Sequence, residues 1–314
     1  MAKTDNLSDF LTDVANSIRT KTGTTEQINA QDFSDKILSI QSESTLKKLL
    51  DTTKSADYLF SNYSGTFESV ENAIQYSDTE NVTSMRYTFS NCRTFQHIPQ
   101  LDTSNVIDMT GMFKGFTSLQ FIGSSLDTSK VTSMREMFSG CTQLGLYHSN
   151  AIQLSNTSNV TDMQSMFENC SSLWTSDVPQ FDTSKVTNMN YMFKNCRGLE
   201  SIPQLDTSNV TSMAGMFLDC TSLTTVPALN ADKVTNMMSM FEGCTNLKSI
   251  LMTNIGTDLT IAYSTQFERS DLLVILNNLK TVTSSRTLTM GATNLAKLTD
   301  EDKAIATNKG WTLA

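Results

Sequence analysis

The sequence predicts an α+β protein whose middle is an elongated solenoid, with a helical module before it and a small α/β cap after it. Three observations predict this architecture. One hydrophobic motif recurs seven times within residues 81–250, the first forty residues carry helix-like apolar spacing, and the motif stops before a C-terminal segment with helix-capping residues. We therefore divide the chain into residues 1–41, 42–80, 81–250 and 251–314.

Residues 1–41 are expected to form two short helices, over 7–22 and 31–40. One face of the first helix would carry Leu7, Phe10, Leu11, Val14 and Ile18, and Gly23 is a natural C-cap. Such a small helical hairpin buries too little apolar surface to be stable alone. It is therefore expected either to dock or oligomerise, or to pack as a cap on the repeats. Residues 42–80 are expected to form a linker and a degenerate capping repeat, in which Phe60 and Tyr63 take the places of Phe and Cys.

Each of the seven repeats is anchored on a valine. The valines are Val82, Val106, Val131, Val160, Val186, Val210 and Val234, at successive spacings of 24, 25, 29, 26, 24 and 24 residues. We count this Val as position 0, so that Met stands at positions 3 and 6, Phe at position 7, Cys at position 10 and Leu at position 13. The exceptions at these sites are Thr88, Phe95 and Phe116. This regularity predicts one structural unit per repeat.

Three parts of the repeat suggest its local structure. The Asp-Thr-Ser-Asn-Val or Asp-Thr-Ser-Lys-Val stretch, as at Val210 and Val186, is turn chemistry, because short polar side chains bond to their own backbone. The Met-x-x-Met-Phe stretch has apolar residues three and four apart, which predicts a helical or 3₁₀ turn. The stretch after Leu, as in Leu223 to Pro227, is expected to be a short strand. Since one unit cannot bury its own apolar face, neighbours must stack.

The unit from Leu205 to Leu223 resembles the BspA-like bacterial surface leucine-rich repeat. The resemblance covers about residues 80–250. It implies a leucine-rich-repeat-like solenoid used for adhesion or recognition, without catalytic residues. Phe116 in place of Cys, and extra residues after Leu144 and before Val186, depart from the pattern.

Residues 251–314 are expected to close the stack. Ser270 is expected to cap a helix over 271–279, residues 287–290 to form a strand, and Thr299 with Asp302 to cap a helix that ends at Gly310. The segment from Asp271 to Leu279, with residues 295–311, is similar to C-terminal modules of phage structural proteins. Residues 18–33 are similar to an N-terminal module of phage tail-associated proteins. These resemblances imply a virion component.

Charge and hydropathy exclude several classes of partner. The net charge of −9 argues against nucleic acid, which requires clustered Lys and Arg. No run of about 18 apolar residues is present, so no membrane span is expected. An ordinary export signal is not expected at the N-terminus, which would suit release of a virion by cell lysis.

The cysteines and the turn aspartates give little reason to expect catalysis or metal binding. The cysteines are Cys92, Cys141, Cys170, Cys196, Cys220 and Cys244, all at position 10. A repeated position forms a line rather than a point, so a buried ladder of free thiols is favoured over a zinc site. The turn aspartates, Asp102, Asp108, Asp127, Asp162, Asp182 and Asp206, are expected to cap turns rather than bind calcium. We expect no enzyme activity, no metal and no cofactor.

The candidate recognition residues follow the repeat Leu in the second to fourth repeats. They are Phe121, Tyr147, His148 and Trp174. Aromatic side chains with polar tips suit contact with glycan or protein, and insertions in a solenoid gather on one face. The alternative is that Phe121 and Trp174 fill gaps in the core.

The sequence therefore predicts a non-enzymatic virion structural or adhesive protein, such as a phage tail, fibre or head-decoration component. It would lie on the virion surface, contact other virion proteins through the N-terminal module, form a homo-oligomer and recognise host glycan or protein. The alternative is a secreted or cell-surface bacterial adhesin of the BspA-like class.

Overall fold

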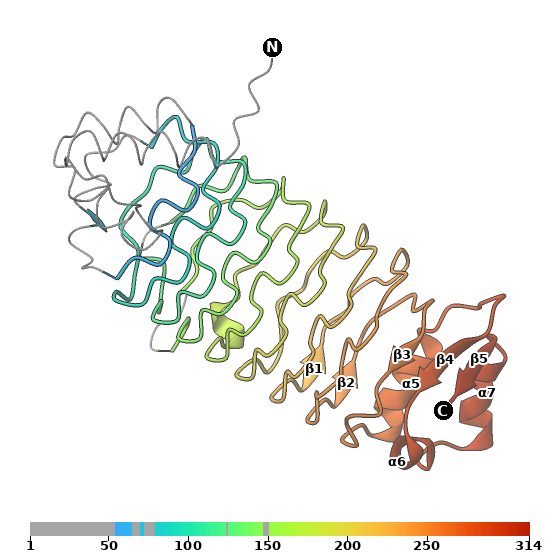
Figure 1. Cartoon of the computed structure of the whole chain (residues 1–314). Coiled ribbons are helices and arrows are strands. Elements are labelled where there is room, and N and C mark those ends of the chain that lie inside the picture. The colour runs from blue at the N-terminus through green and yellow to red at the C-terminus, as the bar shows by residue number, and fades with distance from the viewer. Residues whose placement is uncertain (1–53, 65–69, 72–78, 124, 147–150) are drawn as a thin grey trace, which may run out of the picture.

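The computed structural model describes residues 54–64, 70–71, 79–123, 125–146 and 151–314. The helical module expected at residues 1–41, and most of residues 42–80, lie outside these ranges. The described residues form a row of coils that lie side by side, followed by a C-terminal unit of helices and strands (Figure 1). The repeat fold expected from the sequence is confirmed.

Neighbouring coils are joined by a parallel ladder at position 2 of each repeat. The bridged pairs are Ser55–Ser84, Ser84–Asp108, Asp108–Ser133, Ser133–Asp162, Asp162–Asn188, Asn188–Ser212 and Ser212–Asn236. The first pair brings residues 54–63 into the stack as an additional coil. From position 3 onward, alternate backbone N–H groups donate to the next coil and the others close turns within their own coil, as in Met192 N to Met189 O. Each coil therefore satisfies its backbone partly through its neighbour.

The Met-x-x-Met-Phe segment is not helical, and the helical or 3₁₀ turn expected there is wrong. Among the described residues, the 3₁₀ element is η1 (Thr175–Asp177), which follows a repeat Leu. Each Met-x-x-Met-Phe segment instead has two residues in the left-handed region, at positions 5 and 9, such as Tyr191 (φ 57°) and Asn195 (φ 60°). Left-handed residues end a helix after one turn, and here they let the chain return to the ladder.

Position 9 carries the sequence signal for this geometry. It is occupied by Asn91, Gly115, Gly140, Asn169, Asn195, Asp219 and Gly243, all with positive φ. Gly, Asn and Asp adopt this conformation at the lowest cost. Position 5 is less selective: Tyr87, Glu136 and Ser239 also have positive φ there.

The core is a set of parallel rows running along the stack. The position 7 rings, from Phe60 through Phe89 and onward to Phe241, stack with centroid separations of 5.3 to 5.9 Å. The position 3 and 6 methionines beside them are buried. Each ring between the two ends of the row therefore packs against the rings of both neighbouring coils, which makes the interior continuous.

Two of the exceptions to the repeat pattern compensate each other. Phe95 stands at the Leu position of the first repeat, and Phe116 stands at the Cys position of the second. Their rings meet edge to face at 4.9 Å, and both are buried. The second ring therefore packs against the enlarged side chain in the neighbouring coil.

The Asp-Thr-Ser turns form as expected. Asp206 Oδ1 accepts the N–H of Ser208 at 2.9 Å, and the same bond recurs in the second, third, fourth, fifth and seventh repeats, with Asn156 and Asn230 replacing Asp in two of them. Thr207 Oγ1 donates to the Asn230 carbonyl of the next coil at 2.9 Å. The turn residues thus stabilise both their own turn and the stacking.

Regular strands are few. β1 (Thr225–Val226) and β2 (Ser249–Ile250) pair in parallel after the Leu of the last two repeats, where short strands were expected. In the C-terminal unit, β3 (Leu259–Thr260), β4 (Arg286–Thr289) and β5 (Trp311–Leu313) form a parallel sheet in that order.

The C-terminal unit contains α5 (Arg269–Asn277), α6 (Ala292–Leu295) and α7 (Asp300–Thr307). α5 begins two residues before the expected start, because the Glu268 N–H bonds to Asp271 and Ser270 is not the cap. Thr299 and Asp302 do cap α7. Asp302 also accepts two hydrogen bonds from Arg269, at 2.6 and 2.7 Å, which join α5 to α7.

Candidate recognition surface

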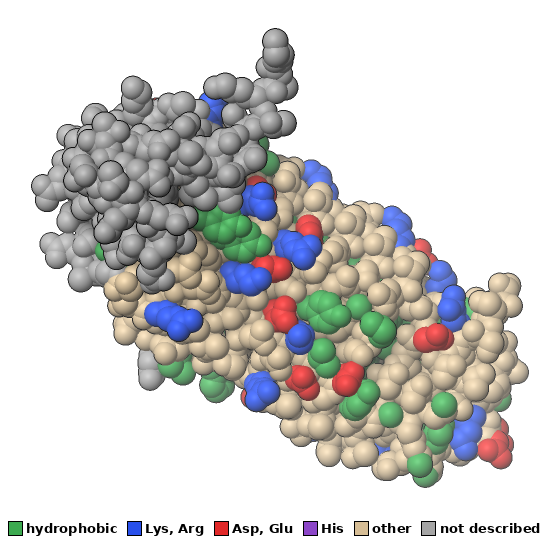
Figure 2. All heavy atoms as spheres, viewed as in Figure 1, with side chains coloured by type: hydrophobic (Ala, Val, Ile, Leu, Met, Phe, Trp, Pro, Cys, Tyr) green, Lys and Arg blue, Asp and Glu red, His purple; other side chains and the backbone are tan. Residues whose placement is uncertain are grey.

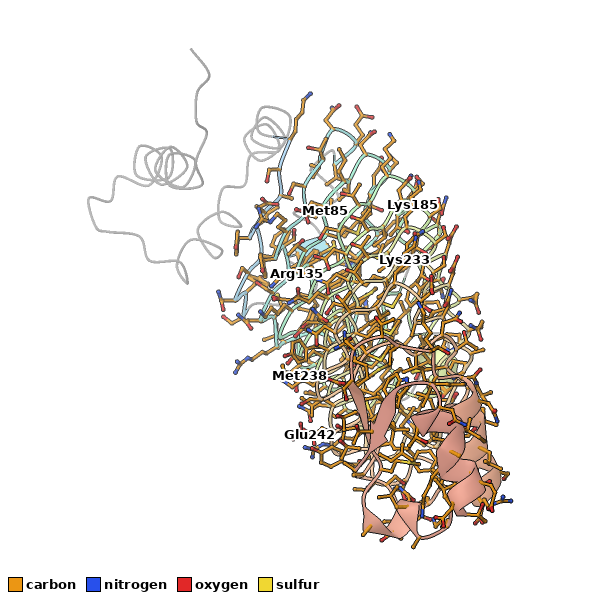
Figure 3. All side chains as sticks on the ribbon, turned by 90° about the vertical axis from the view of Figure 1, so that its right-hand side faces the viewer. Met85, Arg135, Lys185, Lys233, Met238 and Glu242 are labelled. Carbon is orange, nitrogen blue, oxygen red and sulfur yellow. The ribbon has the colours of Figure 1, made fainter. Side chains whose placement is uncertain are left out.

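One face of the coil stack is formed by the outward side chains of the Met-x-x-Met-Phe segments, at positions 4, 5 and 8. We call it the front face. Its larger side chains are Arg86, Tyr87, Lys114, Arg135, Glu136, Gln164, Glu168, Tyr191, Lys194, Leu218, Met238 and Glu242. Figure 2 shows acidic, basic and hydrophobic side chains interspersed over this face. In Figure 3, Arg135, Met238 and Glu242 project on the same side of the stack.

The tyrosines of the front face lie across glycines of the next coil. A Cβ atom on Gly111 would lie 2.2 Å from the Tyr87 ring, and one on Gly215 would lie 2.4 Å from the Tyr191 ring. These glycines therefore make room for flat aromatic contact. Tyr58 stacks on Tyr87 with 5.0 Å between the ring centroids, and it is 37% exposed.

Burial raises the pKa of the Tyr87 phenol, and the charge of Glu136 raises it further. The phenol therefore stays neutral and can both donate and accept a hydrogen bond. An aromatic ring with a neutral hydroxyl is suited to contact with a glycan or a protein.

Ion pairs between coils hold the charged side chains of the front face in place. Lys114 bonds to Glu136 in the next coil, and Lys194 bonds to Glu168 at 2.8 Å while lying 5.4 Å from the Tyr191 ring centroid. Partial burial raises the pKa of Glu136, but the hydrogen bond and charge of Lys114 outweigh this and hold that pKa below its usual value. Exposed pairs of this kind add at most about 1 kcal/mol each, so their main effect is to fix the pattern of charge.

The edge that carries the Asp-Thr-Ser turns is more uniform. From the second repeat onward, asparagine and lysine alternate at the residue before Val: Lys185 donates to Asn159 at 2.7 Å, and Lys233 donates to Asn209 at 2.6 Å. Figure 3 shows Lys185 and Lys233 on the side away from Met238. This edge lacks the aromatic side chains of the front face, so it provides a control surface for binding experiments.

Two of the recognition residues expected from the sequence, Phe121 and Trp174, are described, and neither belongs to the front face. Phe121 is half-buried and packs against the core, with its ring 5.4 Å from the His97 ring. Trp174 is 54% exposed at the start of η1. Tyr147 and His148 lie outside the described residues. Phe121 thus fits the gap-filling alternative, whereas Trp174 projects into solvent.

A buried carboxylate lies behind Trp174, and sequence reasoning missed it. Asp177 is 2% exposed, its Oδ2 accepts the Trp174 N–H at 3.1 Å, and it also accepts the Ala151 N–H. Burial raises its pKa, although the two backbone hydrogen bonds oppose this. Asp177 therefore joins η1 to the end of the insertion in the third repeat.

The six cysteines are buried and free. Each thiol donates to the carbonyl of the Phe in the preceding coil, as in Cys196 Sγ to Phe167 O at 3.1 Å. Burial raises the pKa of Cys92 and of Cys244 to about 12. The thiols are therefore protonated small hydrophobic groups within the stack.

Comparison with known protein families identifies the repeats. The family described as Mycoplasma protein of unknown function, DUF285, matches residues 54–150 and 145–254, which is more than half of the chain. The chain belongs to this family. Both matches lie within the coil stack, and together they span it from the coil at residues 54–63 to the seventh repeat of this DUF285 protein.

Other comparisons add less. A solved leucine-rich repeat protein of T. pallidum (TpLRR) is 16% identical, with a TM-score of 0.37, over 73% of this chain and 88% of that chain. No curated protein matches. Within the described residues, no helix is long and apolar enough to cross a membrane, and no group of three His, Cys, Asp or Glu side chains is placed to hold a metal ion.

Proposed function

We propose that this DUF285 protein is a non-enzymatic recognition protein of the bacterial cell surface, with an adhesive role. The observation that carries the proposal is the front face, where tyrosines, a methionine and paired charges lie at repeated positions on a stacked scaffold. The leucine-rich-repeat-like solenoid expected from the BspA-like resemblance is part of this proposal. The resemblance implies recognition by a repeated surface.

The physical case rests on the rigidity of the front face. From the first to the sixth repeat, its side chains extend from a backbone that is hydrogen-bonded to both neighbouring coils, so little conformational entropy is lost when a partner binds. Tyr and Arg are the residues that most often dominate binding energy at interfaces. The mixture of both charges favours a neutral or mixed-charge partner, such as host glycan or protein.

A binding experiment tests the proposal. The purified chain is labelled and its binding to cultured host cells is measured for a Tyr87→Ala and Tyr191→Ala double variant. We expect at least about a tenfold loss of binding. The matched control is Lys185→Ala and Lys233→Ala on the opposite edge, which should bind as the parent does. Equal binding by both double variants, or a loss confined to the lysine variant, contradicts the proposal.

The virion role stays a prediction that rests on the resemblances at the two ends of the chain, and the N-terminal one lies outside the described residues. Formation of a homo-oligomer, contact with virion proteins and a recognition site centred on Trp174 also stay predictions. Location separates the two roles. A surface adhesin is cleaved when intact source cells are treated with protease, whereas a virion protein co-purifies with particles in fixed copy number.

A further inference from the structure

A small pocket lies between the fourth and fifth coils, at the edge that carries the Asp-Thr-Ser turns. We call this edge the turn edge. The pocket is lined by residues 154–157 of one coil and residues 179–182 of the next, and its volume is about 140 Å³. Asp182 lies three residues before Lys185, which Figure 3 shows on the side of the stack away from Met238. The pocket therefore includes no side chain of the front face.

One additional residue in the fourth repeat accounts for the pocket. In the other repeats the apolar residue before the turn, such as Phe181, is followed directly by the turn Asp or Asn, whereas Ser155 separates Leu154 from Asn156. The Ser155 N–H donates to Leu126 O of the third coil at 3.0 Å, so this part of the fourth coil is held toward the third. Leu154 stays partly exposed, although the matching residues of the second, third, fifth, sixth and seventh repeats are buried.

Few bonds cross from this part of the fourth coil to the fifth. Thr157 Oγ1 donates to Asp182 O at 3.0 Å and accepts the Asp182 N–H at 2.8 Å. At the next two interfaces a glutamine side chain also spans the gap: Gln180 donates to Gln204 O, and Gln204 donates to the coil that follows it, both at 2.6 Å. Gln153 stands at the matching place of the fourth coil and makes no side-chain hydrogen bond within the described ranges. The space between these two coils is therefore left unfilled.

The polar side chains of the pocket have spare hydrogen-bonding atoms. Among the described residues, Nδ2 of Asn156, Oε1 of Gln180 and Oδ2 of Asp182 have no hydrogen-bond partner. Asp182 Oδ1 accepts the N–H and the hydroxyl of Ser184, and these two bonds lower the pKa of the carboxyl. Asp182 is therefore ionised at neutral pH. The pocket offers one amide donor and two acceptors to a ligand.

The size and lining of the pocket suit one sugar ring. Leu154, Pro179 and Phe181 supply its apolar surface. A cavity of about 150 Å³ holds one six-membered ring. A pyranose has C–H groups that can pack on an apolar surface and hydroxyls that both donate and accept hydrogen bonds. The carboxylate of Asp182 repels anions, and the charge of Lys185 already acts on it, which makes a cation a poorer ligand than a neutral hydroxyl.

We propose that this pocket binds one neutral pyranose unit, with Asp182 and Gln180 accepting hydrogen bonds from its hydroxyls and Asn156 donating one. The unit is a free monosaccharide or the terminal residue of a glycan, since both present the same ring and hydroxyls. The inference goes beyond the proposed function, because none of the side chains of the front face takes part.

Titration of the full chain with neutral methyl pyranosides tests the proposal. The glycosides of glucose, galactose, mannose, fucose, N-acetylglucosamine and N-acetylgalactosamine are each added to about 50 mM, because so small a ligand binds with a Kd on the order of 1 mM. Amide resonances are followed by NMR. At least one glycoside should shift the resonances of residues 154–157 and 179–182 saturably and leave residues 228–231 unchanged. The absence of a saturable shift at the pocket with all six overturns the proposal.

A matched pair of variants tests the role of the carboxylate. Asp182→Asn replaces the acceptor Oδ2 by a donor and keeps the turn, because asparagine makes the same turn in the fourth and seventh repeats. It should weaken pyranoside binding about tenfold, as expected for the loss of a hydrogen bond to a charged group. Asp206→Asn makes the same change one coil further along and should leave binding unaltered. Equal weakening by both variants contradicts the proposal.

Charged and extended probes identify the ligand. Methylammonium and glucuronate should leave the pocket resonances unchanged, and a response to methylammonium without one to any glycoside overturns the proposal in favour of a cation site. A disaccharide that ends in the preferred pyranose should bind as its methyl glycoside does if the source is a glycan, and should fail to bind if only a free sugar fits. Loss of host-cell binding in the tyrosine double variant leaves pyranoside binding intact, so the two proposals fail independently.

Discussion

The sixth and seventh repeats have closely similar motifs and different surroundings. Phe217 lies between the rings of Phe193 and Phe241, and the ladder donors of its repeat are all paired. Among the described residues, Phe241 stacks on Phe217 alone, and the ladder donors of its repeat are unpaired. The comparison shows that a repeat motif specifies one side of an interface. Whether that interface is completed depends on the next segment of chain.

The largest expected effect concerns the ring row. Phe193→Ala should lower the free energy of unfolding by about 3 to 5 kcal/mol, because a buried ring is replaced by a cavity. Phe241→Ala should cost about 1 kcal/mol less, since one ring stack rather than two is lost. Denaturant unfolding of both variants measures the difference. An equal or greater loss at Phe241 would show that the C-terminal unit packs as tightly as a repeat.

The second-largest expected effect is a slower reaction of the buried thiols in the folded chain than in the unfolded chain. With the pKa of Cys244 raised to about 12, its thiolate at pH 8 is roughly a thousandfold rarer than that of an unfolded cysteine. We therefore expect alkylation at least about a hundredfold slower in the folded chain. At about pH 8 to 12, these thiols ionise mainly in the unfolded state, which favours unfolding. Their contribution to the free energy of unfolding is therefore fully present below about pH 8 and is lost progressively as pH rises above about 8.5. Rapid labelling of Cys244 alone would show that the seventh repeat opens locally.

Amide exchange should differ between the two repeats without any substitution. In the free protein, Ser239 and Gly243 should exchange at least about tenfold faster than Gly215 and Asp219, whose amides are bonded to the next coil. Mass spectrometry with overlapping peptides, or NMR, measures this. Equal protection in the sixth and seventh repeats would show that the chain after the seventh repeat shields these amides as well as a neighbouring coil does.

A smaller effect is expected at the left-handed positions. Asn195→Ala should destabilise the chain by about 1 kcal/mol, because alanine adopts positive φ less readily than asparagine. Asn195→Gly is the control and should be neutral or slightly stabilising. The seventh repeat already has Gly243 at this position. Denaturation midpoints compare the variants, and an unchanged Asn195→Ala midpoint would mean that the turn relaxes freely.

The smallest expected effect is the pH dependence of the stability that the Asp-Thr-Ser turns contribute. The Ser208 backbone N–H lowers the pKa of Asp206, so this turn stabilises the fold above about pH 4 and loses that stability as pH falls through the lowered pKa. Asp206 is exposed, and solvent limits the effect to a few tenths of a kcal/mol. Asn230 makes the same turn in the seventh repeat without a charge. Asp206→Asn should therefore keep the turn and reduce the acid dependence of unfolding.

Much of the fold could be predicted because the same local interactions form in each copy of the repeat. The Asp-Thr-Ser turns, the buried Phe and Cys rows and the α7 cap at Thr299 all follow from local chemistry. The helical turn was wrong because spacing alone cannot distinguish a helix from successive turns. The signal that could have distinguished them is Gly, Asn or Asp at every position 9.

The candidate surface was harder to predict. Sequence reasoning selected aromatic residues near irregular spacing and found Trp174, which is exposed. It missed the front face, since Tyr87 and Tyr191 stand at variable positions between the repeated Met and Phe residues of a segment that was expected to be helical. Their contact with Gly111 and Gly215 depends on residues of the next coil, 24 positions away in both cases.

By itself, the sequence determined which side chains are buried and that neighbouring units stack, because one period places Met, Phe, Cys and Leu on the same side of every coil. Only the tertiary structure decided which outward side chains meet across coils and where the ladder ends. Both depend on which backbone segment lies beside another, and at the seventh repeat β3 bonds to β4 instead of continuing the ladder.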